Sequence, residues 1–394
     1  MLRIRRLYFY LVLYASLSML LVGVATVLRV LIERLFDIAS SGFFGMFVGQ
    51  AQMQEQTALG TALVLVGLPV WLLHWRVVQG WLGAPGGVDD RRSALRRLYV
   101  YGVLFTTALS ALIAGRDLIE NLLALAIGPT AGSVRPSDVT GPLPFAVVAT
   151  VFWAYHWRIA AVDRNVAGEE DASATLRRWY LYAMLSIGVV LVMRNLAWLC
   201  QQIWQTLLQP ATLTSVGQTT LSRALVSSGA GLLVGLVVMV GHRAWSQSIL
   251  AVPNWHGEDE RRSVLRKLYL YAMVLLTVAT ALTNASEILR FAIASLLGVA
   301  PSAVQGTPVV VALGEPLANT LVFGAFWIFY WRSVGLAAAS QPEVGQQAGV
   351  RRLYFYLVSA IALAFVGVSV ASLLRLSTDV ILQQSAIDLS AMRG

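Results

Sequence analysis

The sequence predicts an all-α, polytopic integral membrane protein with about nine transmembrane helices, built as four tandem parallel hairpin repeats plus a half repeat. Three observations lead to this prediction. Of the 394 residues, 57% are hydrophobic and 12% are charged, whereas soluble domains carry roughly 25% charged residues. Two short phrases recur along the chain. Each phrase borders an apolar run of the length that crosses a bilayer, about 20 residues as a helix.

The first phrase opens with two basic residues and contains two tyrosines, one of which we use to set the copies in register. Its five copies are RRLYFY at 5–10, RRLYVY at 96–101, RRWYLY at 177–182, RKLYLY at 266–271 and RRLYFY at 351–356. The register tyrosines are Tyr8, Tyr99, Tyr180, Tyr269 and Tyr354, with spacings of 91, 81, 89 and 85 residues. Such a long internal period indicates a repeat architecture.

The second phrase is WLLHWR at 71–76, and it recurs as WAYHWR at 153–158 and WIFYWR at 327–332. In this register the third copy has Gly241 at the histidine position, with His242 one residue further on, and the fourth has Tyr330. The chain therefore consists of four two-part units and a fifth first half.

The apolar runs give the helices in order, since helices satisfy the backbone of a chain that crosses lipid. First halves are expected at 7–36, 98–127, 178–208, 268–297 and 352–382, and second halves at 59–81, 144–162, 221–247 and 314–337. We expect a single membrane domain, 1–394, with repeats at 1–85, 86–168, 169–255 and 256–342 and the half repeat at 343–394.

The basic residues predict the orientation. The ends that carry the two phrases, with their connectors, hold 20 of the 29 Lys and Arg residues, and the opposite loops and C-terminal tail hold three. By the positive-inside rule the N-terminus is cytoplasmic, and with nine spans the C-terminus is outside. This placement also accounts for the net charge of +9, so no nucleic-acid partner is expected. The N-terminal MLRIRR, followed by an apolar run, resembles the start of a signal peptide. The same phrase opens four internal segments, so we expect it to be a repeated structural unit and not a signal peptide.

Both phrases fit an aromatic belt, because Trp and Tyr favour the membrane interface and Arg extends past them to phosphate and water. The expected interfacial anchors are Tyr8, Tyr99, Tyr180, Tyr269, Tyr354, Trp75, Trp157 and Trp331. The alternative is that His74 and His156 bind a haem or a pigment. We expect no cofactor and no metal: the single cysteine, Cys200, excludes a site with several cysteine ligands.

Four charged residues lie deep in first-half helices and form an expected intramembrane charged layer: Arg116, Asp117, Arg194 and Glu287. A charge at such depth costs at least about 2.5 kcal/mol on insertion scales, so each should face a partner or water. Arg194 has no acid on its own helix, and we expect it to pair with Asp117 or Glu287. The layer is either a set of packing pairs or a polar pathway for an ion or small anion.

The repeated RRLYxY phrase, with its long apolar run and terminal charges, resembles a bacterial family of membrane proteins that carry the domain of unknown function 5671. The resemblance implies a bacterial cell (inner) membrane location and transfers no activity and no functional residues. No nucleotide-binding or metalloprotease motif occurs, so no catalytic residues are assigned and the balance is against an enzyme.

The function expected first is a non-enzymatic structural or accessory membrane subunit or scaffold. Its partners would be membrane lipids, and other membrane subunits or further copies of the chain. A transporter or channel that uses the charged layer is the second candidate, and a haem- or pigment-binding membrane protein is the third.

Overall fold

The computed structural model describes residues 2–36, 38, 50–128, 133–169, 171–208, 214–296, 308–340 and 346–391. Within these ranges the secondary structure is helical, and nine helices are long and apolar enough to cross a membrane. The predicted fold class is therefore confirmed. The chain is a multi-pass membrane protein in which long helices alternate between first and second halves.

The first-half helices are α1 (Leu2–Leu35), α4 (Ala94–Ile127), α7 (Asp171–Leu208), α10 (Val264–Leu296) and α13 (Gln346–Ala391). The second-half helices are α2 (Gln50–Gly83), α6 (Pro142–Ala167), α8 (Thr214–Leu250) and α12 (Gly314–Ser340). Short helices α3 (Gly87–Arg92), α5 (Pro136–Thr140), α9 (Trp255–Arg261) and α11 (Val309–Ala312) lie in the connections.

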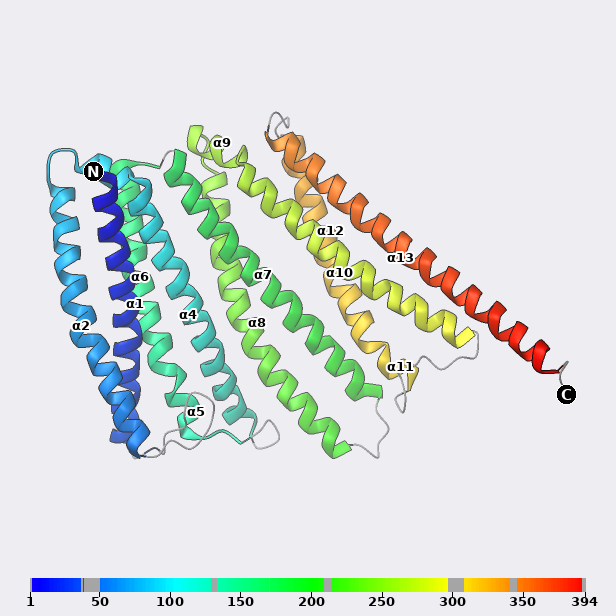
Figure 1. Ribbon diagram of the computed structural model, residues 1–394. Helices are drawn as coiled ribbons and strands as arrows, with labels where there is room; N and C mark the ends of the chain where they lie inside the picture. The colour runs from blue at the N-terminus through cyan, green and yellow to red at the C-terminus, as the bar shows by residue number, and fades with distance from the viewer. Residues whose placement is uncertain are drawn as a thin grey trace.

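The helices form an open array of hairpins. Each second-half helix from α6 onward packs against the first half of its own copy and the first half of the preceding copy: α6 on α4 and α1, α8 on α7 and α4, and α12 on α10 and α7. Figure 1 shows α2 at one edge of the array and α13 at the other. The short helices α3 and α9 lie at the same end as the N-terminus.

Local sequence signals set the helix ends. Ser93 caps α4 and accepts a hydrogen bond from the backbone nitrogen of Arg96 at 3.4 Å, and Asn254 caps α9 through the nitrogens of His256 and Gly257. Both residue types favour this position because their side chains satisfy free N–H groups of the first turn. Gly168 ends α6 with a φ of 73°, a left-handed conformation that costs glycine little.

Small or short polar residues line the seam between the two halves of each hairpin. They recur 8 residues after the register tyrosine, as Ser16, Thr107, Gly188 and Thr277, and 15 residues after it, as Gly23, Ala114, Asn195 and Asn284; the same offsets in α13, which belongs to the half repeat, hold Ala362 and Ser369. A Cβ built on Gly188 would lie 2.7 Å from the backbone nitrogen of Met239 in α8. Such close approach is how membrane helices gain packing energy without a hydrophobic effect between them.

Candidate functional site

Successive copies meet through paired tyrosine rings, which we call the tyrosine ladder. The second tyrosine of each phrase lies against the first tyrosine of the next. The pairs and their centroid separations are Tyr10–Tyr99 (5.6 Å), Tyr101–Tyr180 (5.9 Å), Tyr182–Tyr269 (5.3 Å) and Tyr271–Tyr354 (5.1 Å). These separations are typical of favourable aromatic pairs. In a YxY phrase the first tyrosine therefore contacts the preceding copy, and the second tyrosine, two residues later, contacts the following copy.

Acidic residues of each connector bind the basic pair of the preceding copy. Asp90 pairs with Arg6, Glu169 with Arg97 (Oε1 to Nη1, 3.7 Å), and Glu260 with Arg178 (Oε2 to Nε, 2.9 Å). We call each such contact, with its tyrosine pair, a junction. The described chain contains an ion-paired junction at each of the first three boundaries between copies.

Glu260, on α9, is the most completely enclosed of these acids, with no exposed surface. Its carboxylate accepts hydrogen bonds from Arg177 Nη2 at 2.8 Å, Arg178 Nε at 2.9 Å and the hydroxyl of Tyr182 at 2.8 Å. A buried charge is tolerated when it is paired and its remaining lone pairs are satisfied. Here three donors from one helix, α7, hold the connector of the next copy.

Glu169 plays the equivalent part between the second and third copies. It accepts hydrogen bonds from the hydroxyl of Tyr101 at 2.9 Å and from Arg177 Nε at 2.5 Å. Arg97 lies 3.7 Å from the same carboxylate and donates to the carbonyl of Gly168 at 3.0 Å. The C-terminal end of α6 is thereby capped by a cation, which its dipole favours.

His74 and His156, the ligands of the alternative cofactor site, lie within the hairpins and contact the register tyrosines. His156 donates from Nδ1 to the carbonyl of Phe152 at 2.9 Å, so its Nε2 accepts from the hydroxyl of Tyr99 at 3.2 Å. His74 packs against Tyr8 and Phe9, with ring centroids 5.9 and 5.1 Å away. Both nitrogens of His156 are occupied, so metal ligation there would require a hydrogen bond to break.

The third copy shows that our sequence register was one residue off at this site. His242, not Gly241, occupies the histidine position: its Nδ1 lies 2.8 Å from the carbonyl of Val238 and its Nε2 lies 3.4 Å from the hydroxyl of Tyr180. In the fourth copy the Tyr330 hydroxyl lies 2.6 Å from that of Tyr269. Each of the four two-part copies therefore joins its two halves through a ring on the second half that contacts the register tyrosine.

The expected interfacial anchors differ in how much of each side chain is exposed. Tyr8 is 54% exposed and Trp331 is 48% exposed, as anchors at a lipid surface would be. The remaining register tyrosines and Trp75 are buried, and Trp157 is half-buried, between helices. Their rings therefore contribute helix packing, and their depth in a bilayer stays a prediction.

The charged layer is not brought together as the sequence led us to expect. Arg116 pairs with Glu120 at 2.8 Å and with Asp117 at 3.4 Å, all on α4. Glu287 pairs with Arg290 on α10 at 2.8 Å. Arg194 is exposed, and among the described residues it forms no ion pair. The predicted interhelical pair of Arg194 with Asp117 or Glu287 is thus wrong.

The repeat itself explains the position of Arg194. It lies 14 residues after its register tyrosine, and this position is exposed in every copy. The five residues there are Val22, Ile113, Arg194, Thr283 and Val368. Our prediction used the depth of Arg194 along the helix and ignored the face on which it lies.

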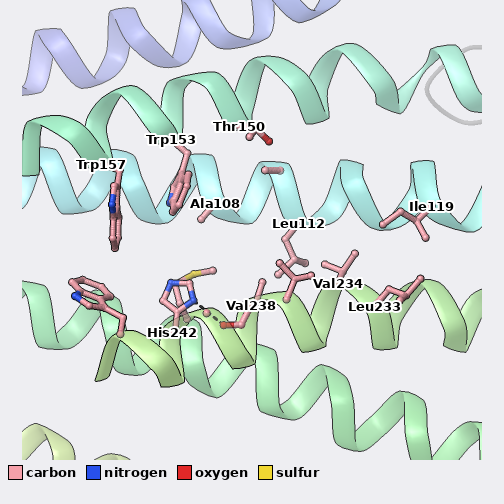
Figure 2. A pocket seen from close by; sticks show the side chains of 15 residues that line it. Ala108, Leu112, Ile119, Thr150, Trp153, Trp157, Leu233, Val234, Val238 and His242 are labelled. Carbon is pink, nitrogen blue, oxygen red and sulfur yellow. Dashed lines mark hydrogen bonds between the residues drawn. The ribbon is translucent and has the colours of Figure 1, made fainter. Parts of the chain in front are cut away.

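A lateral groove of about 700 Å³ separates α6 from α8 and has α4 as its floor. Figure 2 shows Trp153 and Trp157 on one wall and Leu233, Val238 and His242 on the other. The lining is almost wholly apolar. At the end of the groove nearest the two repeated phrases, the ring centroids of Trp157 and Trp245 lie 4.7 Å apart.

A family model described as "Domain of unknown function (DUF5671)" matches residues 6–145, 130–225 and 205–315. No curated protein and no solved structure matches the chain. Within the described residues, no group of three or more His, Cys, Asp or Glu side chains is placed to hold a metal ion.

Proposed function

Because the chain belongs to the DUF5671 family, whose function is unknown, we propose a role from its geometry: a non-enzymatic scaffold of the bacterial cell membrane. In this role α10 and α13 hold a transmembrane helix of a partner subunit. The junctions support the proposal because they tie neighbouring copies into one array, and an ordered array is what a scaffold requires.

One observation carries the proposal: α13 exposes the face that second-half helices cover in the other copies. Eight residues after the register tyrosine, Ser16, Thr107 and Thr277 are 2%, 2% and 0% exposed. The equivalent residue of α13, Ala362, is exposed. In the part of the chain that the structure describes, no helix covers this face of α13.

The exposed face has the chemistry of a helix-packing seam. Ala362 and Ser369 supply the small positions, and Phe365, Val366 and Leu373 lie between and beyond them at helical spacing, 60%, 58% and 66% exposed. Small residues admit a neighbouring backbone and the larger ones fill its grooves. The occupant that fits is an apolar helix that runs antiparallel to α13, as each second half runs against its first half.

The docking face can be tested with a photoreactive benzophenone side chain in place of Phe365, and as a control in place of Val368. We expect Phe365 to crosslink, in the native host, to one protein of fixed size that has a transmembrane helix. Ala362→Trp should abolish this crosslink because its ring fills the seam, and Ala364→Trp, on the opposite face of α13, should leave it. Crosslinks to lipid alone, to a second copy of this chain, or equally from Val368 would overturn the proposal.

We further propose the orientation with the phrases and connectors in the cytoplasm. The test uses a Cys200→Ser background with single cysteines at exposed positions: Ala84→Cys and Ala251→Cys in the connectors, and Ser133→Cys in the opposite loop. An impermeant thiol reagent added to intact cells should label Ser133→Cys alone. It should label the other two after the cells are opened. Labelling of Ala84→Cys in intact cells would reverse the orientation.

A further inference from the structure

We infer that the lateral groove binds an anionic phospholipid of the cytoplasmic leaflet, with one acyl chain between α6 and α8 and the phosphate at Arg164. This site is independent of the docking face on α13. It follows from the length and polarity of the groove, from the position of one cation at its end, and from the absence of that cation in the equivalent places of the other copies.

The groove has the dimensions of an extended chain. Along its floor it runs from Ala108 to Ile119 on α4, which is about 17 Å at a rise of ~1.5 Å per residue. Small residues create the space: Ala108 and Ala111 on α4, and Gly241 on α8. A Cβ built on Gly241 would meet no atom within 4 Å. An apolar space of this kind on a lipid-facing surface suits a hydrocarbon chain.

Arg164 lies where the headgroup of such a lipid would be. It follows Trp157 by seven residues, two helical turns, and so shares the groove-facing side of α6. Its guanidinium carbon lies 5.7 Å from the ring centre of Trp157 and 5.5 Å from that of Trp245. The cation thus covers the two indoles that close this end of the groove.

The guanidinium has donor capacity that the described residues leave unused. Its Nη1 is buried and has no hydrogen-bond partner among them. The neighbouring acids are engaged elsewhere: Asp163 with Arg91 and Arg96, and Glu169 with Arg97 and Arg177. Buried donors are rarely left without an acceptor. Phosphate oxygens would supply one with charge-assisted geometry.

The second copy has an arginine, Arg164, at a position where the other two-part copies have apolar residues. Eight residues after the ring of the second half, the first, third and fourth copies have Leu82, Leu250 and Ala338 where the second has Arg164. Arg164 is therefore not needed for the repeat architecture. It occurs next to the groove, which indicates a ligand that is bound at this one position.

The test is native mass spectrometry of the detergent-purified protein, titrated with phosphatidylglycerol or phosphatidylethanolamine. We expect one phosphatidylglycerol to bind more tightly than phosphatidylethanolamine. Arg164→Gln should weaken it about tenfold, since a charged hydrogen bond is lost. Gly241→Leu should weaken it as much by filling the groove. Glycerol 3-phosphate, which lacks the chains, should not displace the lipid.

Two matched variants control for charge and for bulk. Arg158→Gln removes an exposed arginine of the same helix, and Gly324→Leu fills a position in α12 where an added Cβ also meets no atom within 4 Å. Both should bind phosphatidylglycerol as the parent does. Unchanged binding in Arg164→Gln and Gly241→Leu, equal affinity for the two lipids, or competition by glycerol 3-phosphate would overturn the inference.

Discussion

Replacement of Glu260 with leucine should lower the free energy of unfolding in detergent by about 3–5 kcal/mol, the usual cost when one member of a buried ion pair is removed. The loss is expected because Arg177 and Arg178, which are 5% and 8% exposed, would keep their charges without this acceptor. The hydroxyl of Tyr182 would lose its acceptor as well. Unfolding by a denaturing detergent, followed by tryptophan fluorescence, measures the change.

Glu258→Leu is the matched control for Glu260→Leu. Glu258 lies on the same short helix, α9, but its side chain is 54% exposed and its ion pair with Arg262 is 4.0 Å long. Exposed pairs contribute about 0–1 kcal/mol, so this variant should unfold close to the parent. Equal destabilisation by the two substitutions would mean that helix α9, and not its buried carboxylate, carries the effect.

Tyr269→Ala should be the second large loss, about 3–5 kcal/mol by comparison with other large-to-small aromatic substitutions. The ring of Tyr269 lies 5.3 Å from Tyr182 of the preceding copy, and its hydroxyl lies 2.6 Å from that of Tyr330 in its own copy. Tyr269 thus contacts both the preceding copy and the second-half helix of its own copy. The same unfolding measurement applies.

Two variants separate the contributions of Tyr269. Tyr269→Phe keeps the ring and removes the hydrogen bond, and should cost about 1 kcal/mol. Tyr356→Ala removes the second tyrosine of the last copy, which is 72% exposed, and should be nearly neutral. If Tyr356→Ala destabilises as much as Tyr269→Ala, the tyrosines act through lipid and not through the tyrosine ladder.

The sequence predicted the helices well because they depend on local properties. Apolar length and the recurring phrases are readable without knowledge of tertiary contacts. The junctions were not predicted, although their signal was present: Asp90, Glu169 and Glu260 each precede the basic pair of the following phrase. To connect them with the preceding copy's arginines requires knowing that parallel first halves lie side by side.

The errors at Arg194 and Gly241 have a common physical origin. Both residues were placed by counting along the chain, which gives depth but not the face of the helix. A shift of one residue turns a side chain by about 100°, so His242 and not Gly241 contacts Tyr180. The residue at the offset of Arg194 is exposed in all five copies, so the helix face on which it lies, and not its depth, determines its surroundings.

The central claim, that connectors lock successive copies together, is tested most directly by a mutant cycle across the third junction. Its corners are the parent, Glu260→Leu, Arg178→Leu, and the two changes combined, because Arg177 also pairs with Glu169, whereas the other partner of Arg178, Asp259, is exposed. Replacement of a whole buried ion-pair group by apolar residues is often neutral, whereas removal of one side leaves uncompensated charge. We predict that the combined variant recovers about 2 kcal/mol or more of the free energy of unfolding lost in Glu260→Leu. Losses that simply add, within about 0.5 kcal/mol, would show that the groups act independently and would contradict the junction.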